Sequence, residues 1–195
     1  MPLRFAPEPV NGTRLVQAGL RRLAARPSYL SSIVSDFSSL QVSHPHLVYD
    51  LRAEAIARGG GLETATLSGL RYLVEDGNRT VAAAEVSLDG AGSATVLANL
   101  NYGPYVQATA QALTEVATLT AVAAGSYEVR LLRFAAIYLM ALWLRSDSGG
   151  ADIIYPLAPA PTGLNAGRAY SPEDLVQIVR PLAQERVAPG RIGIP

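Results

Sequence analysis

The sequence contains no cysteine and no lysine, and only two of its residues are histidine. The lack of cysteine excludes disulfide bonds, thiolate nucleophiles and thiolate metal ligands, and suits a cytosolic protein. Charged residues make up 16% of the chain, against roughly 25% in typical soluble domains. A surface this poor in charge indicates cover by a subunit or partner. The same bias, together with abundant alanine, is equally typical of a GC-rich genome.

The chain also has no net charge and no apolar segment long enough to cross a membrane. The formal net charge is zero, which argues against nucleic-acid binding because that task needs basic groups to neutralise phosphates. Met1 to Val10 shows neither the basic start nor the apolar core of a secretory signal. The apolar run from Phe134 to Leu144 would span about 16 Å as a helix, about half of a bilayer core. We therefore expect no transmembrane span and a cytoplasmic location.

Turn residues divide the middle of the chain into strands. Asp76-Gly77-Asn78 and Asp89-Gly90 separate apolar runs of strand length, and aspartate-glycine between such runs is typical of a hairpin because the turn requires positive φ. This pattern predicts an antiparallel meander with strands at about 65–75, 80–88 and 93–102.

Five helices are expected around these strands. Each begins near a capping residue or a proline and carries apolar residues at helical spacing. They run from about Thr13 to Arg26 with an end at Pro27, from Ser28 to about Leu40, from Leu51 to Arg58 after a cap at Asp50, over about 105–123 after Pro104, and from Ser171-Pro172 onwards.

The first of these helices has a basic face. Arg14, Arg21, Arg22 and Arg26 lie on it without an acidic residue among them. Such a face binds anionic membranes or acidic partners in some proteins, whereas a solvated helix face is the ordinary interpretation. The sequence leaves the two open.

The stretch from Tyr127 to Arg145 is the most apolar part of the chain. It contains the only tryptophan and no charge between Arg133 and Arg145. As one straight strand it would be about 60 Å long, which is too long for an ordinary strand. Alternation of apolar and charged residues at its start favours a strand over a buried helix. We predict a bent strand with a bulge at Phe134 to Ala136, paired onward with 153–155.

Together these patterns predict a single α+β domain over residues 1–195. It consists of a curved antiparallel β-sheet of about five strands packed against the long helix at about 105–123, with the N-terminal and C-terminal helices flanking it. Proline and glycine content predicts an extended arm at 1–10, a connection at 156–170 and a loose tail at 188–195.

Three charged residues fall inside apolar strands, namely Arg71, Glu85 and Arg133. An unpaired buried ion costs several kcal/mol, so each should be paired or face water. We predict that an acid pairs with Arg133 and that Glu85 is held by one of the two arginines. Such a pair either fixes the strand register or orients a ligand.

A second group of polar candidates surrounds the start of the long helix. Asn101-Tyr102-Gly103-Pro104-Tyr105 joins a strand to a helix N-terminus, where free N–H groups attract anions. Tyr138, Trp143 and Tyr155 are candidates for the same concave sheet face. The predicted ligand-binding residues are therefore Arg71, Glu85, Asn101, Tyr102, Tyr105, Arg133, Tyr138 and Trp143.

Other motifs indicate no metal and no cofactor. His44-Pro45-His46 lies near Asp50, but proline places the pair in a turn and the chain has no third histidine. Gly59-Gly60-Gly61 lacks the lysine and hydroxyl residue of a phosphate-binding loop. No Gly-x-Ser-x-Gly elbow supports a serine nucleophile.

Two functional hypotheses follow. The first is a non-catalytic protein-interaction or assembly module that self-associates, using the uncharged surface, the proline-rich arms or a sheet edge. The second is a small-molecule-binding protein or an enzyme that uses the concave sheet face near Glu85, Arg133, Tyr102 and Tyr105. Catalysis is the less favoured of the two because the chain lacks a recognisable catalytic cluster.

Overall fold

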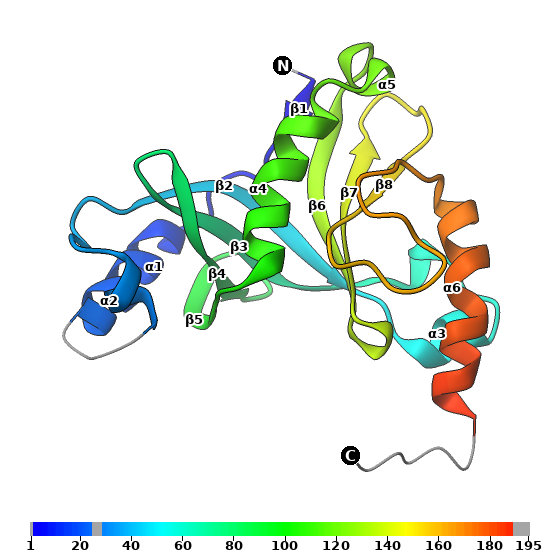
Figure 1. The fold of residues 1–195 in the computed structure, drawn as a ribbon, viewed down its shortest axis with the longest axis horizontal. Coiled ribbons are helices and arrows are strands. Elements are labelled where there is room, and N and C mark those ends of the chain that lie inside the picture. The colour runs from blue at the N-terminus through cyan, green and yellow to red at the C-terminus, as the bar shows by residue number, and fades with distance from the viewer. Residues whose placement is uncertain (1, 25–28, 189–195) are drawn as a thin grey trace.

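The computed structural model describes residues 2–24 and 29–188, to which all structural statements refer. Its architecture is α+β, with helices on both faces of one open, mostly antiparallel sheet (Figure 1). The predicted fold class is confirmed. The helices are α1 (Gly12–Ala24), α2 (Tyr29–Ile33), α3 (Ala53–Ala57), α4 (Pro104–Val116), α5 (Thr120–Ala123) and α6 (Pro172–Val187), with 3-10 turns η1 (Leu62–Thr64) and η2 (Ala135–Ile137).

The sheet has eight strands in the order β5-β4-β3-β2-β6-β7-β8, with β1 also beside β6. The expected number of about five was wrong because β1 was missed, β2 was expected only as a short extended piece at 47–49, and the stretch 127–145 forms two strands. The predicted meander is confirmed as β3, β4 and β5. The strands are β1 (Leu3–Arg4), β2 (Gln41–Asp50), β3 (Thr66–Asp76), β4 (Arg79–Leu88), β5 (Ala94–Asn101), β6 (Tyr127–Phe134), β7 (Leu139–Ser146) and β8 (Ile153–Pro156).

One parallel pairing joins the two halves of this sheet. β2 runs beside β6 from Leu47, opposite Arg130, to Asp50, opposite Arg133. The meander lies on one side of this seam and the β6–β7–β8 hairpins lie on the other (Figure 1). The short β1 continues along the same side of β6, pairing Leu3 with Tyr127.

The helices divide the interior into three apolar clusters. α4 and α5 cover one face of the sheet, where Val106 and Leu113 pack against strand residues such as Leu131. On the other face, α1 and α2 cover β3 and β4, while α3 and α6 cover β6 and β7 (Figure 1). The sheet is therefore the middle layer of three.

The N-terminal arm is bound to the domain along much of its length. Besides the β1 pairing, the Ala6 amide donates to the Pro45 carbonyl at 2.9 Å. The Glu8 carboxylate accepts from the Thr13 amide at 2.7 Å, which caps α1, and from the buried Tyr72 hydroxyl at 3.0 Å. Burial raises the pKa of Tyr72, and Glu8 adds to this effect.

The stretch from Tyr127 to Arg145 is a hairpin, so both the bent strand and the alternative helix were wrong. β6 pairs antiparallel with β7 from Tyr127, opposite Ser146, to Phe134, opposite Leu139. The break lies at the expected place, but the chain reverses there through η2. Tyr138 closes the reversal with φ 56° and ψ 34°, in the left-handed region. Glycine or asparagine usually occupies such a position, so the sequence carried no turn signal.

Three helix predictions also need correction. The expected helix from Ser28 to Leu40 stops at Ile33, because the Asp36 carboxylate accepts from the Ser38 amide at 2.8 Å and favours a local turn. The expected long helix at 105–123 is divided into α4 and α5, which are separated by Leu119 in an extended conformation. The N-cap of α3 is Arg52, not Asp50. The predicted end at Pro27, Arg26 on the basic face and the tail beyond 188 lie outside the described residues.

The start of α6 agrees with its sequence signals and provides a test. Ser171 Oγ accepts from the Asp174 amide at 3.0 Å, and Pro172 occupies the first turn. We predict that Ser171→Ala lowers the free energy of unfolding by about 1 kcal/mol, because one helix amide loses its acceptor. Urea unfolding measures the loss, with Ser148→Ala in an exposed loop as the matched control. Equal stabilities of the two variants would contradict the capping role.

Candidate functional sites

The eight predicted site residues lie in four separate places. Four of them, Arg71, Glu85, Asn101 and Arg133, converge on the sheet face under α4. Tyr105 and Tyr138 line a surface cavity. The other two are elsewhere: Tyr102 packs beside the α1–α2 core, and Trp143 faces α3 and α6.

A charged cluster, defined here as His46, Asp50, Arg71, Glu85 and Arg133, crosses four adjacent strands. In the ladder, His46 lies opposite Arg71, Arg71 opposite Glu85, and Asp50 opposite Arg133. Because side chains alternate along a strand, Arg71 and Glu85 share the face of Leu73 and Ala83, which pack in the cluster under α4. The charged cluster therefore lies inside the domain.

Arg133 is the centre of this cluster. It donates to both carboxylate oxygens of Asp50, at 2.6 and 3.2 Å, and to Glu85 Oε2 at 3.1 Å. The hydrogen bond to Asp50 raises the pKa of Arg133, and Glu85 adds to this effect. The predicted pairing of Arg133 with an acid is confirmed. Asp50 was not recognised as its partner, because only the parallel seam brings the two residues together.

Arg71 is the least satisfied member. Its side chain is 1% exposed, and its Nη1 lies 3.8 Å from Glu85 Oε1, beyond hydrogen-bonding distance. Its Nε and Nη2 have no hydrogen-bond partner. Burial lowers the pKa of Arg71, while Glu85 acts in the opposite direction. Asn101 Nδ2 also donates to Glu85, at 3.3 Å.

His46 is buried and neutral. Its Nδ1 lies 2.6 Å from the His44 carbonyl oxygen, which only accepts, so we assign the ring proton to Nδ1. Nε2 has no partner. Burial lowers the pKa of His46 to about 3. The His44-Pro45-His46 segment belongs to β2 instead of a turn, and the described residues contain no group of three histidines or acids placed to hold a metal ion.

The charged cluster is an ionic network in which positive and negative groups balance. It contains two guanidinium groups and two carboxylates, and it reaches solvent at Asp50 and Arg133, whose side chains are 35% and 27% exposed. Arg71, Glu85 and Arg133 line none of the five main cavities of the described chain. Its ion pairs join residues of neighbouring strands, and its solvent-facing part is the Arg133–Asp50 pair.

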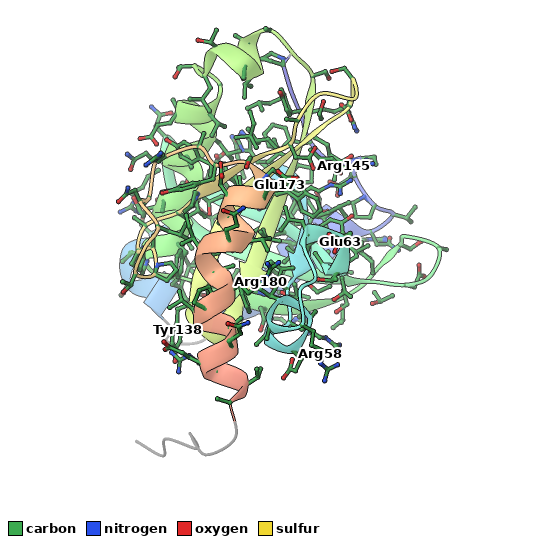
Figure 2. All side chains as sticks on the ribbon, turned by 90° about the vertical axis from the view of Figure 1, so that its right-hand side faces the viewer. Arg58, Glu63, Tyr138, Arg145, Glu173 and Arg180 are labelled. Carbon is green, nitrogen blue, oxygen red and sulfur yellow. The ribbon has the colours of Figure 1, made fainter. Side chains whose placement is uncertain are left out.

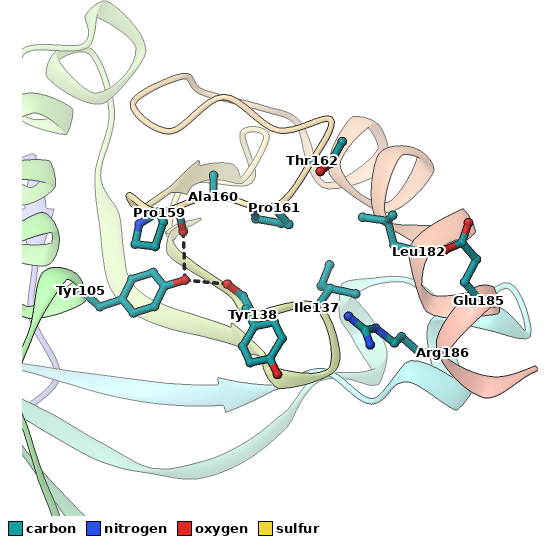
Figure 3. Close-up of a pocket in the computed structure, with 10 residues that line it drawn as sticks. All are labelled: Tyr105, Ile137, Tyr138, Pro159, Ala160, Pro161, Thr162, Leu182, Glu185 and Arg186. Carbon is teal, nitrogen blue, oxygen red and sulfur yellow. Dashed lines mark hydrogen bonds between the residues drawn. The ribbon is translucent and has the colours of Figure 1, made fainter. Parts of the chain in front are cut away.

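The second place is a cavity of 420 Å³ between the β6–β7 turn, the 159–162 loop and α6 (Figure 3). The Tyr105 hydroxyl lies 2.6 Å from the Tyr138 carbonyl oxygen and 2.9 Å from that of Pro159. Burial raises the pKa of Tyr105, which keeps this hydroxyl protonated as a donor. The lining residues are Tyr105, Ile137, Tyr138, Pro159, Ala160, Pro161, Thr162, Leu182, Glu185 and Arg186.

A third place is the charged cavity of 700 Å³ near Trp143. The indole Nε1 donates to Asp152 at 2.7 Å, and the Arg130 guanidinium stacks 5.1 Å from the indole ring centre. Tyr155, expected beside Trp143, faces α4 instead, because it pairs with Leu142. Figure 2 shows the charged side chains around this cavity, contributed by η1, β7 and α6: Glu63, Arg145, Glu173 and Arg180.

Arg180 has a structural role at this cavity. Its guanidinium donates to the Ile56 and Gly59 carbonyls, both at 3.3 Å, and so closes the C-terminal end of α3.

Among the described helices, none is both long and apolar enough to cross a bilayer. The predicted set missed His46, Asp50 and Asp152, because their roles depend on contacts between distant segments.

We predict that His46 makes stability pH-dependent. Its folded pKa of about 3 lies below the unfolded value of 6.5, so its contribution is complete above pH 6.5 and is lost as the pH falls toward 3. The slope is about 1.4 kcal/mol per pH unit, or about 2 kcal/mol between pH 7 and pH 5. Urea unfolding at both pH values should show this loss reduced in His46→Asn. His44→Asn, at a 39% exposed side chain, is the control, and an unchanged loss in His46→Asn would refute the assignment.

We predict an asymmetry between Arg71 and Glu85. Glu85→Gln leaves the buried Arg71 without a carboxylate and should cost about 3 kcal/mol of unfolding free energy. Arg71→Met should cost less than about 1 kcal/mol, because Glu85 keeps Arg133 and Asn101 and the two unpartnered nitrogens Nε and Nη2 disappear. Urea unfolding of both variants provides the comparison. A larger loss for Arg71→Met would show that Arg71 makes bonds stronger than those described.

Comparison with known proteins identifies no matching family model, no similar curated protein and no similar solved structure. The features of this chain that bear on function are the largely buried charged cluster, the cavities at Tyr138 and Trp143, and the distribution of charge over the helices.

Proposed function

We propose that this protein is a non-catalytic assembly module that binds a second copy of itself through the outer surface of α4 and α5. One observation carries the proposal. The segment from Gly90 to Tyr127 contains a single charged residue, Glu115. This segment includes α4 and α5, which lie on one face of the sheet (Figure 1).

The one charge in this segment is bound within the domain. Glu115 Oε2 accepts from the Tyr155 hydroxyl at 2.8 Å, and Oε1 accepts from Gln111 Nε2 at 2.6 Å. Burial and then Glu115 raise the pKa of Tyr155 to about 12, so the phenol remains a donor. Glu115 is therefore held to the domain by two hydrogen bonds, and the other outer side chains of the two helices are neutral.

The exposed residues of this surface are short and neutral. A solvent-facing helix surface ordinarily carries charged side chains, whereas the centre of a protein interface is depleted in them. Small side chains also let a second helix approach closely. The exposed positions are Gln107, Gln111, Thr114, Ala117, Thr118, Thr120, Ala121, Ala123 and Ala124.

Charge also favours a second copy as the partner. A contact around a twofold axis places the same surface patch of both copies face to face, so a patch with charge of one sign repels itself. The face of α1 with the exposed arginines Arg21 and Arg22 is such a patch, whereas the exposed α4–α5 positions are neutral. Because α4 is about 20 Å long, the contact is smaller than a standard interface of about 800 Å² per partner, and we expect weak, micromolar association.

The sheet edges are poorer sites for assembly. The β4–β5 ladder has register shifts at two places, and bulges in an edge strand oppose pairing with another strand. At the other edge, Ile154 of β8 exchanges backbone hydrogen bonds with Tyr170 at 2.9 and 2.8 Å. These features favour the helical surface over the edge that the sequence also suggested.

We predict a monomer–dimer equilibrium that an added charge abolishes. Sedimentation equilibrium between about 1 and 500 µM should show a dimer at the upper concentrations. Ala117→Arg and Thr114→Arg should each leave a monomer, because each copy would bring a bulky positive charge into a neutral contact.

The matched control is Ala169→Arg, at an exposed position of the loop before α6. It adds the same charge and should leave the equilibrium unchanged. Circular dichroism should show that the three variants remain folded. A wild-type monomer throughout the range, or equal effects of all three variants, would overturn the proposal.

A further inference from the structure

We propose that the cavity between the β6–β7 turn, the 159–162 loop and α6 binds a small organic carboxylate with an apolar or aromatic body. The site is separate from the assembly surface, which is formed by the outer side chains of α4 and α5. Three features of the described residues indicate this ligand. They are the left-handed backbone and exposed ring of Tyr138, the cavity walls joined by Tyr105, and the Arg186 guanidinium, which has no partner among these residues.

Tyr138 is the aromatic side chain held against its preferences. Its backbone lies in the left-handed region, with φ 56°, which side chains of this size rarely adopt. Its side chain is also 76% exposed, so packing within the domain does not offset the strain. Residues with a strained backbone that packing does not compensate are concentrated at functional sites. Its phenol ring and hydroxyl are available to a ligand at the mouth of the cavity.

Tyr105 makes the cavity rigid before any ligand arrives. Its hydroxyl reaches the carbonyl oxygens of both Tyr138 and Pro159, and so holds the two walls at a fixed distance (Figure 3). Pro159 and Pro161 restrict the backbone of the loop further. The volume of 420 Å³ lies within the range of small-molecule sites. A preformed site of this kind binds without a large ordering cost.

The charges around the cavity favour an anion. Arg186 extends toward Tyr138 and Ile137, whereas the carboxylate of Glu185 lies beyond Leu182, away from Tyr138 (Figure 3). No hydrogen bond or ion pair within the described residues engages Arg186. A guanidinium group binds a carboxylate through two parallel hydrogen bonds. Ile137, Leu182 and Pro161 would then cover the apolar body of the same ligand.

The binding experiment compares three probes that share a phenyl group on a short alkyl chain and differ in the charge of the terminal group. 3-Phenylpropionate, its neutral amide and 3-phenylpropylamine are titrated into the full-length chain and followed by ¹H–¹⁵N chemical shifts. We expect the carboxylate to bind with a millimolar dissociation constant, the amide about tenfold more weakly, and the amine not at all. Saturable shifts should be confined to residues around the cavity.

Three variants connect the binding to the named side chains. Arg186→Gln should weaken the carboxylate about tenfold and leave the amide unchanged, while the adjacent Glu185→Gln should not weaken either probe. Tyr138→Asn should weaken both probes and keep or raise the melting temperature, because asparagine accepts the left-handed backbone. A ring that served the fold would instead lower the melting temperature when removed.

Several outcomes would overturn the proposal. One is the absence of saturable shifts with 3-phenylpropionate at about 10 mM, a limit that allows for weak small ligands. Another is equal affinity for the acid and the amide, and a third is full affinity in Arg186→Gln. None of these results depends on self-association, because Ala117→Arg supplies a monomeric background in which the titration can be repeated.

Discussion

The parallel pairing of β2 with β6 is the constraint on which the remainder of this structure depends. It joins a meander, β2 to β5, to the hairpins from β6 to β8, and each half has its own helices on the outer face. The apolar cluster under α4 contains strand residues of both halves, such as Leu73 and Leu131. The bidentate Arg133–Asp50 pair lies at the end of this seam. Parallel pairing of segments so distant in sequence requires such a specific contact, because closing the chain costs entropy.

The seam also accounts for the charges inside the domain. A slip of one residue between β3 and β4 would move Arg71 or Glu85 to the opposite face, among apolar residues such as Tyr72 and Ala84. The correct register instead aligns two cations with two anions across four strands. Arg71 nevertheless keeps unpartnered N–H groups, so the cluster contributes more to the choice of register than to net stability.

The sequence predicted those elements whose signals are local. The meander was predictable because aspartate-glycine turns separate its strands, and α6 because Ser171 and Pro172 mark its start. Elements that depend on distant contacts were missed. β2 carries Pro45 and two histidines, which argue against a strand until β3 and β6 supply partners on both sides. For the same reason Arg133 was recognised as needing an acid, although nothing local identified Asp50.

Tyr138 lies at the chain reversal that the sequence analysis did not predict, and it is also the strongest indication of a ligand. Among the described residues, Asn11 and His44 also have positive φ without being glycine, and each has a local side-chain contact, with Arg14 and Ser43 respectively. Asparagine and histidine also tolerate this conformation better than tyrosine does. A hairpin selected only for folding would contain glycine or asparagine at this turn. That tyrosine stands there, exposed beside an unpaired arginine, is explained if the ring serves a molecule outside the fold.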